Sequence, residues 1–237
     1  MKRKFHASLL FIALLLLPFV SAQIGPNFEQ SCSNGVCTTN IYSYQKYYQE
    51  SNQWQQINEN FGTQNCEQGY NYCVDNNLYQ FHIKNAFSEP LVVYGNTRLS
   101  FNLGSFGSLT QIPSLAQVER NTVIYPNIIP GIDVKYTYLP HKVKEELIVK
   151  DKTLFAALTA NLSLEFTLNA HGKTINTLGK TIKAGDLHIA DLVAYDSAGH
   201  LTTIPFYLRG NTYTMIVPLD WQKNETNINP ITIDTTI

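Results

Sequence analysis

The chain is poor in charge and has a single long apolar run. Charged residues make up 15% of its 237 residues, so Asn, Gln, Ser, Thr and Tyr have to supply most of the polar surface, which suits an extracellular setting. With 17 basic and 18 acidic residues there is no excess of positive charge. This excludes the basic surface that nucleic acid or an anionic membrane requires. At 44% apolar residues the chain has ample material for a core, which excludes disorder as the default.

The apolar run lies at the N-terminus and has the features of a secretory signal peptide. Lys2, Arg3 and Lys4 precede apolar residues 7–20, and Val20-Ser21-Ala22 offers the small residues that a signal peptidase requires. The run is shorter than the roughly 20 residues of a membrane-spanning helix. We predict a signal peptide over residues 1–22, cleavage before Gln23, no membrane insertion after cleavage, and a secreted or cell-surface protein. An uncleaved N-terminal anchor is the alternative.

The rest of the chain contains no periodic repeat and no low-complexity linker, but its composition shifts. Removal of residues 1–22 leaves 14 of the 17 basic residues against 18 acidic ones, a net charge of about −4. Residues 23–80 are rich in Tyr, Gln and Asn and hold every cysteine, whereas residues 81–237 are richer in aliphatic residues. We expect a disulfide-containing N-terminal segment over residues 23–80 and a β-sandwich-like domain over residues 81–237.

The four cysteines form two closely spaced pairs, Cys32 with Cys37 and Cys66 with Cys73. Counting alone allows three connectivities. The short spacings favour two local disulfides, as expected in an oxidising compartment. A four-thiolate zinc site is the alternative, although neither pair has the two-residue gap that is common in zinc ribbons. We predict disulfides, no metal and no cofactor.

Strand signals dominate the chain after residue 78. Apolar and polar residues alternate over residues 78–83, 99–103, 134–138 and 162–168, and a short apolar run covers residues 91–94. Turn chemistry follows at residues 140–142, 196–199 and 209–211. The helical signal is weak and limited to residues 114–120 and 152–160. Many short strands without intervening helices predict an all-β fold, an antiparallel sandwich with a disulfide-pinned N-terminal segment attached or integrated as extra strands.

Several patterns between residues 125 and 234 resemble a known module. These are Tyr-Pro-Asn-Ile-Ile-Pro-Gly-Ile-Asp at residues 125–133, Lys-Glu-Glu-Leu-Ile-Val at residues 144–149, Tyr-Asp-Ser-Ala-Gly at residues 195–199, Trp221 and Ile-Thr-Ile-Asp at residues 231–234. Their order and spacing resemble the β-rich N-terminal domain of large secreted and cell-surface proteins, where it precedes β-propeller-type (SBBP) or Rhs/YD-type repeats. The resemblance covers roughly residues 115–237. Thr235 stands where members usually have Pro. The resemblance implies a surface module without catalytic residues.

The sequence gives little indication of a catalytic site. Gly104-Ser105-Phe106-Gly107 lacks the order of a nucleophile turn and is expected to form a glycine-rich hairpin or loop. Glu145 and Glu146 are adjacent, so on one strand they point to opposite faces and cannot act together on one bond. Glu165 is expected on the solvent face. A calcium site using Asp133, Asp196 or Asp234 is an alternative to purely structural roles, in which Asp133 accepts backbone N–H bonds or pairs with Lys135 or Lys144.

Binding and glycosylation remain as candidate chemistry. Aromatic residues crowd the N-terminal part beside Gln and Asn, and such rings stack on sugars or partner side chains. The alternative is that these rings fill a half-buried β surface. Asn161 and Asn224 open glycosylation sequons. The possible stacking residues are Tyr42, Tyr44, Tyr47, Tyr48, Trp54, Tyr70 and Tyr72.

We therefore expect a non-catalytic secreted or cell-surface module for structure or adhesion, whose partners are other surface proteins or glycans. A lectin-like module that uses the N-terminal aromatics is the alternative, and a secreted hydrolase is the third. An exposed edge strand would permit assembly by strand addition.

Overall fold

A computed structural model describes residues 22–237 except 34–35, 44, 76, 156–159, 223 and 225–227. The predicted signal peptide, apart from its last residue, lies outside this part. The described chain is all-β, and every strand pairing is antiparallel. Its helical elements are the 3-10 turn η1 (Lys152–Phe155) and the single turn α2 (Leu219–Gln222). In the part of the chain that is described, no helix has the length and apolar character needed to cross a membrane.

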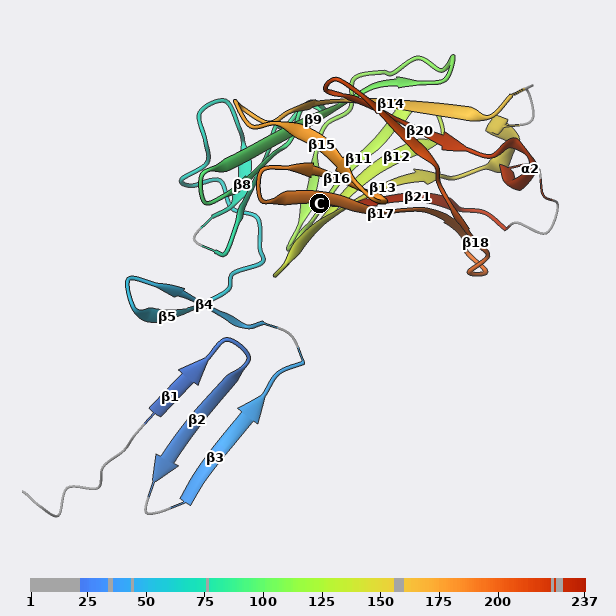
Figure 1. The fold of residues 1–237 in the computed structure, drawn as a ribbon. Helices are drawn as coiled ribbons and strands as arrows, with labels where there is room; N and C mark the ends of the chain where they lie inside the picture. Colours follow the sequence, from blue (N-terminus) through green and yellow to red (C-terminus); the bar gives the residue numbers. More distant parts are fainter. Residues whose placement is uncertain are drawn as a thin grey trace, which may run out of the picture. The chain divides into compact units, whose positions relative to one another are not determined.

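The chain divides into two compact units after Ile57. The first contains a three-stranded sheet of order β1-β2-β3 and a separate hairpin of β4 and β5 (Figure 1). The strands are β1 (Ala22–Gly25), β2 (Phe28–Ser33), β3 (Val36–Ile41), β4 (Tyr47–Glu50) and β5 (Gln53–Gln56). Cys32 and Cys37 stand directly opposite each other on β2 and β3 and form a disulfide. All six residues of β3 are exposed, so this sheet has no buried face at β3.

The second unit, residues 58–237, is a sandwich of two antiparallel sheets (Figure 1). The larger sheet has the order β10-β11-β12-β13-β21-β17-β16-β15, and β18 also pairs with β17. Its strands are β10 (Gln117–Glu119), β11 (Thr122–Ile129), β12 (Ile132–Leu139), β13 (Lys142–Val149), β15 (Ile175–Leu178), β16 (Thr181–Ala184), β17 (Leu187–Asp196), β18 (Leu201–Thr203) and β21 (Ile231–Thr236).

The smaller sheet has the order β19-β20-β14-β9-β8-β7-β6. Its strands are β6 (Tyr72–Val74), β7 (Gln80–Ile83), β8 (Leu91–Tyr94), β9 (Thr97–Phe106), β14 (Leu162–Asn169), β19 (Phe206–Arg209) and β20 (Thr212–Val217). Both sheets contribute side chains to one hydrophobic core. Tyr136 of the larger sheet contacts Phe81 and Phe101 of the smaller one edge to face, at ring-centre distances of 5.7 and 6.1 Å.

The predicted all-β fold is confirmed, and the alternating runs coincide with strands. Residues 134–138 lie in β12, where every second residue is buried, and residues 162–168 lie in β14 with the same pattern. The helical prediction for residues 114–120 is wrong, because residues 117–119 form β10 beside β11. Of the hairpin or loop expected around Gly104, residues 104–106 form the end of β9, and a tight turn follows at Gly107, which has φ of 57°.

The local disulfides predicted from the spacing are present. Cys66 and Cys73 form the second one, and the described residues include no free cysteine. The four-thiolate zinc alternative is therefore not realised in this structure. The boundary between the units falls after Ile57, whereas the change in composition lies near residue 80. Residues 58–80 belong to the sandwich because β6 pairs with β7 at the end of the smaller sheet.

Candidate functional site

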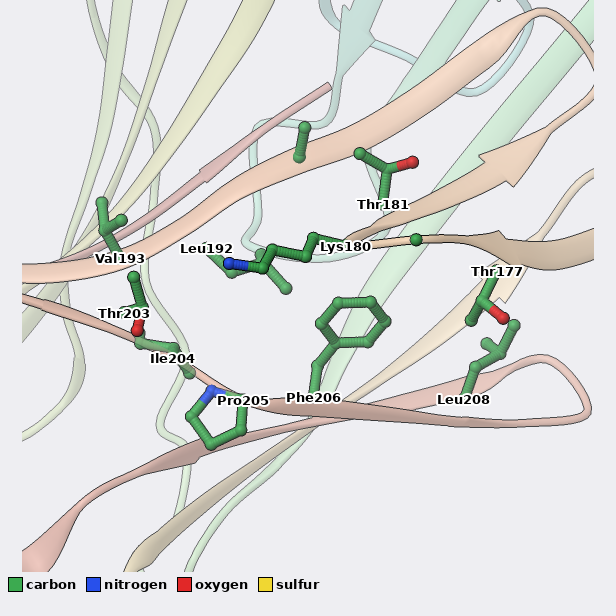
Figure 2. Close-up of a pocket in the computed structure, with 12 residues that line it drawn as sticks. Thr177, Lys180, Thr181, Leu192, Val193, Thr203, Ile204, Pro205, Phe206 and Leu208 are labelled. Carbon is green, nitrogen blue, oxygen red and sulfur yellow. The ribbon is translucent and has the colours of Figure 1, made fainter.

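The described sandwich contains a groove where the two sheets leave an open side. One wall comes from the hairpin β15–β16, and the other comes from β19 and the residues that lead into it from β18 (Figure 2). The hairpin turns at Gly179, which has φ of 61°, a conformation that favours glycine. Both β15 and β19 are edge strands, since each pairs with only one neighbour. The groove therefore lies between two unpaired backbone edges.

The floor of the groove results from an irregularity in β17. The pairing of β17 with β21 shifts register between Ala190 and Val193, and the pairing with β16 ends at Ile189. On the same side β18 begins to pair only at Val193, and Ile204 N–H donates to the Leu192 carbonyl at 2.9 Å. The stretch between these two pairings opens into the groove.

The groove has an apolar floor, a hydroxyl-bearing rim and one cation. Its volume is about 850 Å³. Figure 2 shows the Phe206 ring beside the Lys180 side chain, which extends across the groove. Lys180 is the only charged residue among the described residues that line it, and it forms no ion pair with a described residue. The lining residues are Thr177, Gly179, Lys180, Thr181, Ala190, Leu192, Val193, Thr203, Ile204, Pro205, Phe206 and Leu208.

The strands that form the groove also carry exposed apolar side chains that do not line it. Leu178 at the end of β15, Leu201 in β18 and Tyr207 in β19 are 59%, 61% and 65% exposed. Large exposed apolar residues gathered at a sheet edge are typical of interaction surfaces, because folded proteins otherwise shield such edges. The chemistry that the groove offers is apolar contact, backbone hydrogen bonding and one positive charge.

The aromatic residues predicted to stack on a ligand fall into both units. Tyr42, Tyr47, Tyr48 and Trp54 belong to the first unit and Tyr70 and Tyr72 to the second, while Tyr44 lies outside the described residues. Tyr47 and Tyr48 are buried. Tyr42 donates to the Glu29 carboxylate, and Tyr70 packs on the His82 ring at 5.8 Å. A stacking surface built from these residues stays a prediction.

The adjacent glutamates of β13 point to opposite faces, as predicted. Glu145 is buried in the core, where it accepts hydrogen bonds from the Tyr136 hydroxyl at 2.7 Å and the Thr235 hydroxyl at 3.0 Å. Burial outweighs these bonds and raises the pKa of Glu145 to about 7. No substrate can reach a carboxyl group between two packed sheets, so Glu145 offers no surface chemistry.

Glu146 belongs to a charged network on the outer face of the larger sheet. Its carboxylate binds Lys135 and Lys144 at 2.8 and 2.7 Å, and Lys144 also binds Asp234 at 3.1 Å. Burial alone would raise the pKa of Glu146, but hydrogen bonds from Lys135, Lys144 and Tyr195 outweigh it and lower the pKa. Burial raises the pKa of Asp234 to about 6 despite Lys144. Because the Lys144 ammonium group lies between the two carboxylates, the network already contains its own counter-ion.

The three aspartates considered for a calcium site each interact with different partners. Asp133 accepts the Asn127 N–H at 2.7 Å, and its cation is Lys150 at 2.8 Å, whereas Lys135 and Lys144 pair with Glu146. Asp196 is buried and accepts the Ala198, His200 and Ile228 N–H groups. Among the described residues these carboxylates belong to no cluster of potential metal ligands.

One constellation resembles nucleophilic chemistry. The Ser100 hydroxyl donates to Glu89 and lies 3.4 Å from His171 Nε2. Here serine stands between the acid and the histidine, whereas an activated serine needs the histidine in the middle. Ser100 is also only 1% exposed. Glu165, the remaining carboxylate considered for hydrolysis, lies exposed on β14.

The two sequons differ in what the structure describes. Asn161 is exposed, and its side-chain carbonyl accepts the Leu219 N–H at 2.9 Å. Asn224 is exposed as well, but the next two residues of its sequon lie outside the described part.

Comparisons of this chain with protein-family profiles, with curated proteins and with solved structures find no match. The groove residues were not predicted from the sequence. Phe206 and Lys180 lie 26 residues apart in unremarkable strand and turn segments, and only the packing of two sheet edges brings them together.

Proposed function

We propose that this chain is a non-catalytic extracellular structural module that assembles with other copies of itself through the groove between β15 and β19. The single observation that carries the proposal is the apolar groove between two edge strands. The two disulfides and the predicted signal peptide support an extracellular setting. The resemblance to surface modules described above supports a structural role.

The occupant we propose is β3 of a second copy. Its side chains are exposed along its whole length, and it is the edge strand of its own sheet. Folded proteins usually protect such strands with charges, Pro or bulges, and β3 contains no charged residue and no Pro. Val36 and Ile41 are 70% and 77% exposed. An unprotected strand with apolar side chains fits an apolar groove that has unpaired backbone on both walls.

Sedimentation velocity over a wide range of protein concentration tests this assembly. We expect reversible association of the wild type. Val36→Lys on β3 and Thr177→Arg on the groove wall should each weaken association about tenfold or more, which corresponds to about 1.4 kcal/mol. Both residues are exposed, so their substitution should leave the unfolding temperature nearly unchanged.

Tyr94→Lys is the matched control, because Tyr94 is an exposed apolar residue at the end of β8 and does not line the groove. This variant should associate like the wild type. A protein that stays monomeric at every concentration would overturn the assembly proposal. Equal loss in the control would show that added charge, rather than the groove, controls association.

Glycan binding is the second candidate, because the groove is lined by the Phe206 ring and by the hydroxyl groups of Thr177 and Thr203 (Figure 2). Aromatic faces with nearby hydroxyl groups suit sugar rings. A monomeric protein whose binding to oligosaccharides depends on Phe206 would favour this function over assembly.

A further inference from the structure

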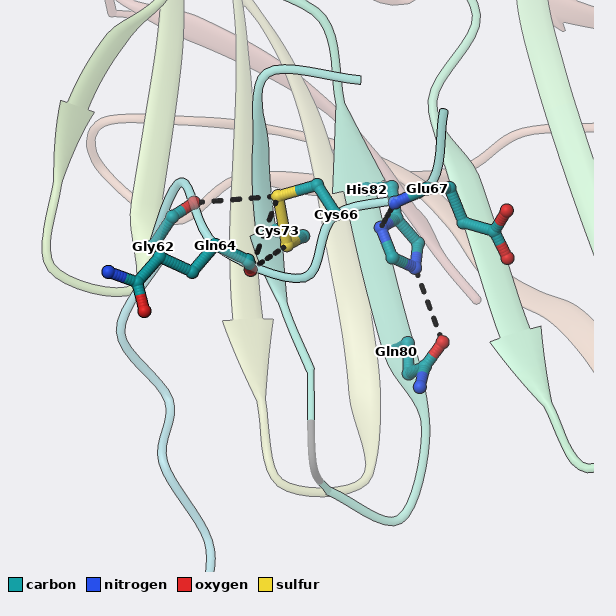
Figure 3. The surroundings of a disulfide bond; sticks show 7 residues. All are labelled: Gly62, Gln64, Cys66, Glu67, Cys73, Gln80 and His82. Carbon is teal, nitrogen blue, oxygen red and sulfur yellow. Dashed lines mark hydrogen bonds between the residues drawn. A yellow bond between two sulfur atoms is a disulfide. The ribbon is translucent and has the colours of Figure 1, made fainter. Parts of the chain in front are cut away.

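A histidine lies directly beside the disulfide of the sandwich (Figure 3). Cys73 of β6 and His82 of β7 are paired residues across two antiparallel strands, so their side chains share one face at close range. Cys66 reaches the same place from the preceding loop. The two sulfur atoms and a ring nitrogen of His82 all lie within 4.8 Å of one another. Cys73 and His82 are each only 1% exposed.

Contacts that involve no sulfur hold the loop over this face. Gly62 and Cys73 exchange two backbone hydrogen bonds, of 2.8 and 2.9 Å. Glu67 N–H donates to His82 Nδ1 at 3.2 Å, and the Glu67 carboxylate binds Arg98 at 2.7 Å. The two Gly62–Cys73 bonds and the Glu67–Arg98 ion pair do not use the His82 ring, so these three anchors persist when the ring binds a metal. Cys66 should stay near Cys73 and His82 when the disulfide is opened.

The His82 ring has the state and orientation of a metal ligand. Burial, the largest cause, lowers its pKa and so favours the neutral form of the ring, which is the form that binds metals. Because Nδ1 accepts the Glu67 N–H, the ring proton lies on Nε2, which is 3.3 Å from Gln80 Oε1. Ligating histidines commonly donate their second N–H to such a partner, which fixes the ring. Nδ1 is then the nitrogen that carries the ring's lone pair, and a metal bound there replaces the Glu67 N–H.

Carbonyl groups surround the sulfur atoms. The Gln64 carbonyl oxygen lies 3.3 Å from Cys73 Sγ and 3.8 Å from Cys66 Sγ, and the Gly62 oxygen lies 3.8 Å from Cys66 Sγ. Two thiolates without a counter-ion would be unfavourable here, because the carbonyl oxygens carry partial negative charge and thiolates form where positive charge is near. A bound divalent cation would remove this penalty. Once reduced, the pair is therefore better suited to metal binding than to free thiolate chemistry.

We propose that Cys66, Cys73 and His82 form a thiol-gated zinc site, closed in the disulfide state and open after reduction. A dithiol or phosphine reductant supplies two electrons, the S–S bond breaks, and each sulfur takes a proton. Zn²⁺ then binds both sulfurs and His82 Nδ1, and the two thiol protons leave to water. A two-electron oxidant reverses the step, reforms the S–S bond and releases Zn²⁺.

The expected geometry is tetrahedral with three protein ligands. Zinc bonds to sulfur are about 2.3 Å long, so the two sulfurs have to separate to roughly 3.7 Å. Two thiolates and one imidazole favour zinc over the hard cations Mg²⁺ and Ca²⁺. The fourth position stays open for water, as in zinc sites with three protein ligands.

The test is a zinc titration of the phosphine-reduced protein against a chromophoric chelator, without oxygen. Reduction also frees Cys32 and Cys37, which could bind zinc themselves, so the titration uses a Cys32→Ser/Cys37→Ser protein. In this variant only the proposed site has thiols, and it should bind one Zn²⁺. The oxidised form should bind none. Cys66→Ser/Cys73→Ser in the otherwise unchanged chain should lose this tight site, and His82→Gln should weaken binding at least about tenfold.

X-ray absorption of the zinc-loaded reduced protein identifies the zinc ligands directly. It needs no substitution at the buried site, so it does not depend on whether such a variant folds. Two sulfur neighbours and at least one nitrogen are expected. Absence of zinc binding after reduction, binding that does not change in His82→Gln, or a coordination shell without sulfur would each overturn the proposal.

Discussion

Glu145 is a carboxyl group buried in the interior of the sandwich. It lies between the sheets, with Tyr136 and Thr235 as its hydrogen-bond donors. Its pKa is about 7 in the folded protein against 4.5 in an unpaired glutamate. As the pH rises, Glu145 therefore loses its proton at a lower pH in the unfolded chain than in the folded protein. Between pH 4.5 and 7 the folded state holds more protons, so the free energy of unfolding decreases with rising pH.

We predict that Glu145→Gln removes most of this dependence. The shift corresponds to on the order of 3 kcal/mol across that pH range, as an upper limit. The amide keeps the shape of the side chain and carries no charge, so the variant should be more stable than the wild type at pH 8 and no more stable at pH 4. Urea unfolding at several pH values measures the effect.

Glu165→Gln is the control, because this carboxylate is exposed on β14. It should reproduce the wild-type pH profile. A smaller slope in the same direction should remain in Glu145→Gln, since burial raises the pKa of Asp234 from 3.8 to about 6. Parallel profiles of wild type and Glu145→Gln would show that Glu145 does not titrate in this range.

Part of this residue-level picture was predictable. Adjacent residues of a strand alternate between faces, and this separates Glu145 from Glu146 without a structure. The partners were not predictable. Asp133 was expected to accept backbone N–H bonds, which it does, but its cation is Lys150 across the sheet, because register and side-chain length decide the pairing.

At the scale of elements, the turn between β16 and β17 connects the two sheets. Gly185 in this turn has φ of 62°, and an added Cβ would lie 2.6 Å from the Thr97 hydroxyl oxygen at the start of β9. The next residue, Asp186, and Thr97 interact through side-chain and backbone hydrogen bonds of 3.3 and 3.4 Å. This turn holds the larger sheet against the β8–β9 hairpin of the smaller one.

We predict that Gly185→Ala destabilises the sandwich more than Gly210→Ala. Both glycines have φ of 62°, so both variants bear the cost of a left-handed alanine, about 1 kcal/mol. An added Cβ at Gly210 meets no atom within 4 Å, whereas at Gly185 it collides with Thr97. Overpacking of this kind adds about 1–3 kcal/mol. Equal unfolding midpoints for the two variants would contradict the contact.

The strands themselves were the most predictable elements. Alternation identified β12 and β14, and Asp, Gly and Pro identified the turns after β12, β17 and β19. The short strand β10 was missed because three residues carry too little pattern and gain their conformation from pairing with β11. The groove was missed for a similar reason, since no local pattern reports where two sheet edges meet.

At the scale of the whole molecule, the division into two units has a measurable consequence. The chain divides after Ile57, and residues 62–74 are tied into the sandwich by the Gly62–Cys73 backbone bonds and by the pairing of β6 with β7. We predict that limited proteolysis produces a stable fragment that begins near residue 58. Mass spectrometry identifies the cut. A stable fragment beginning near residue 81 would instead place the boundary where the composition changes.

The position of β21 governs when the sandwich can form. Residues 231–236 come after all the other described strands in sequence, yet they lie between β13 and β17 in the middle of the larger sheet, and all six are buried. During synthesis the strands before them therefore form two halves of a sheet with no strand to join them. The sandwich cannot close until this segment has left the ribosome, which delays folding until well over two hundred residues have been made. Until then the edges of β13 and β17 that β21 will cover remain unpaired and open to wrong partners.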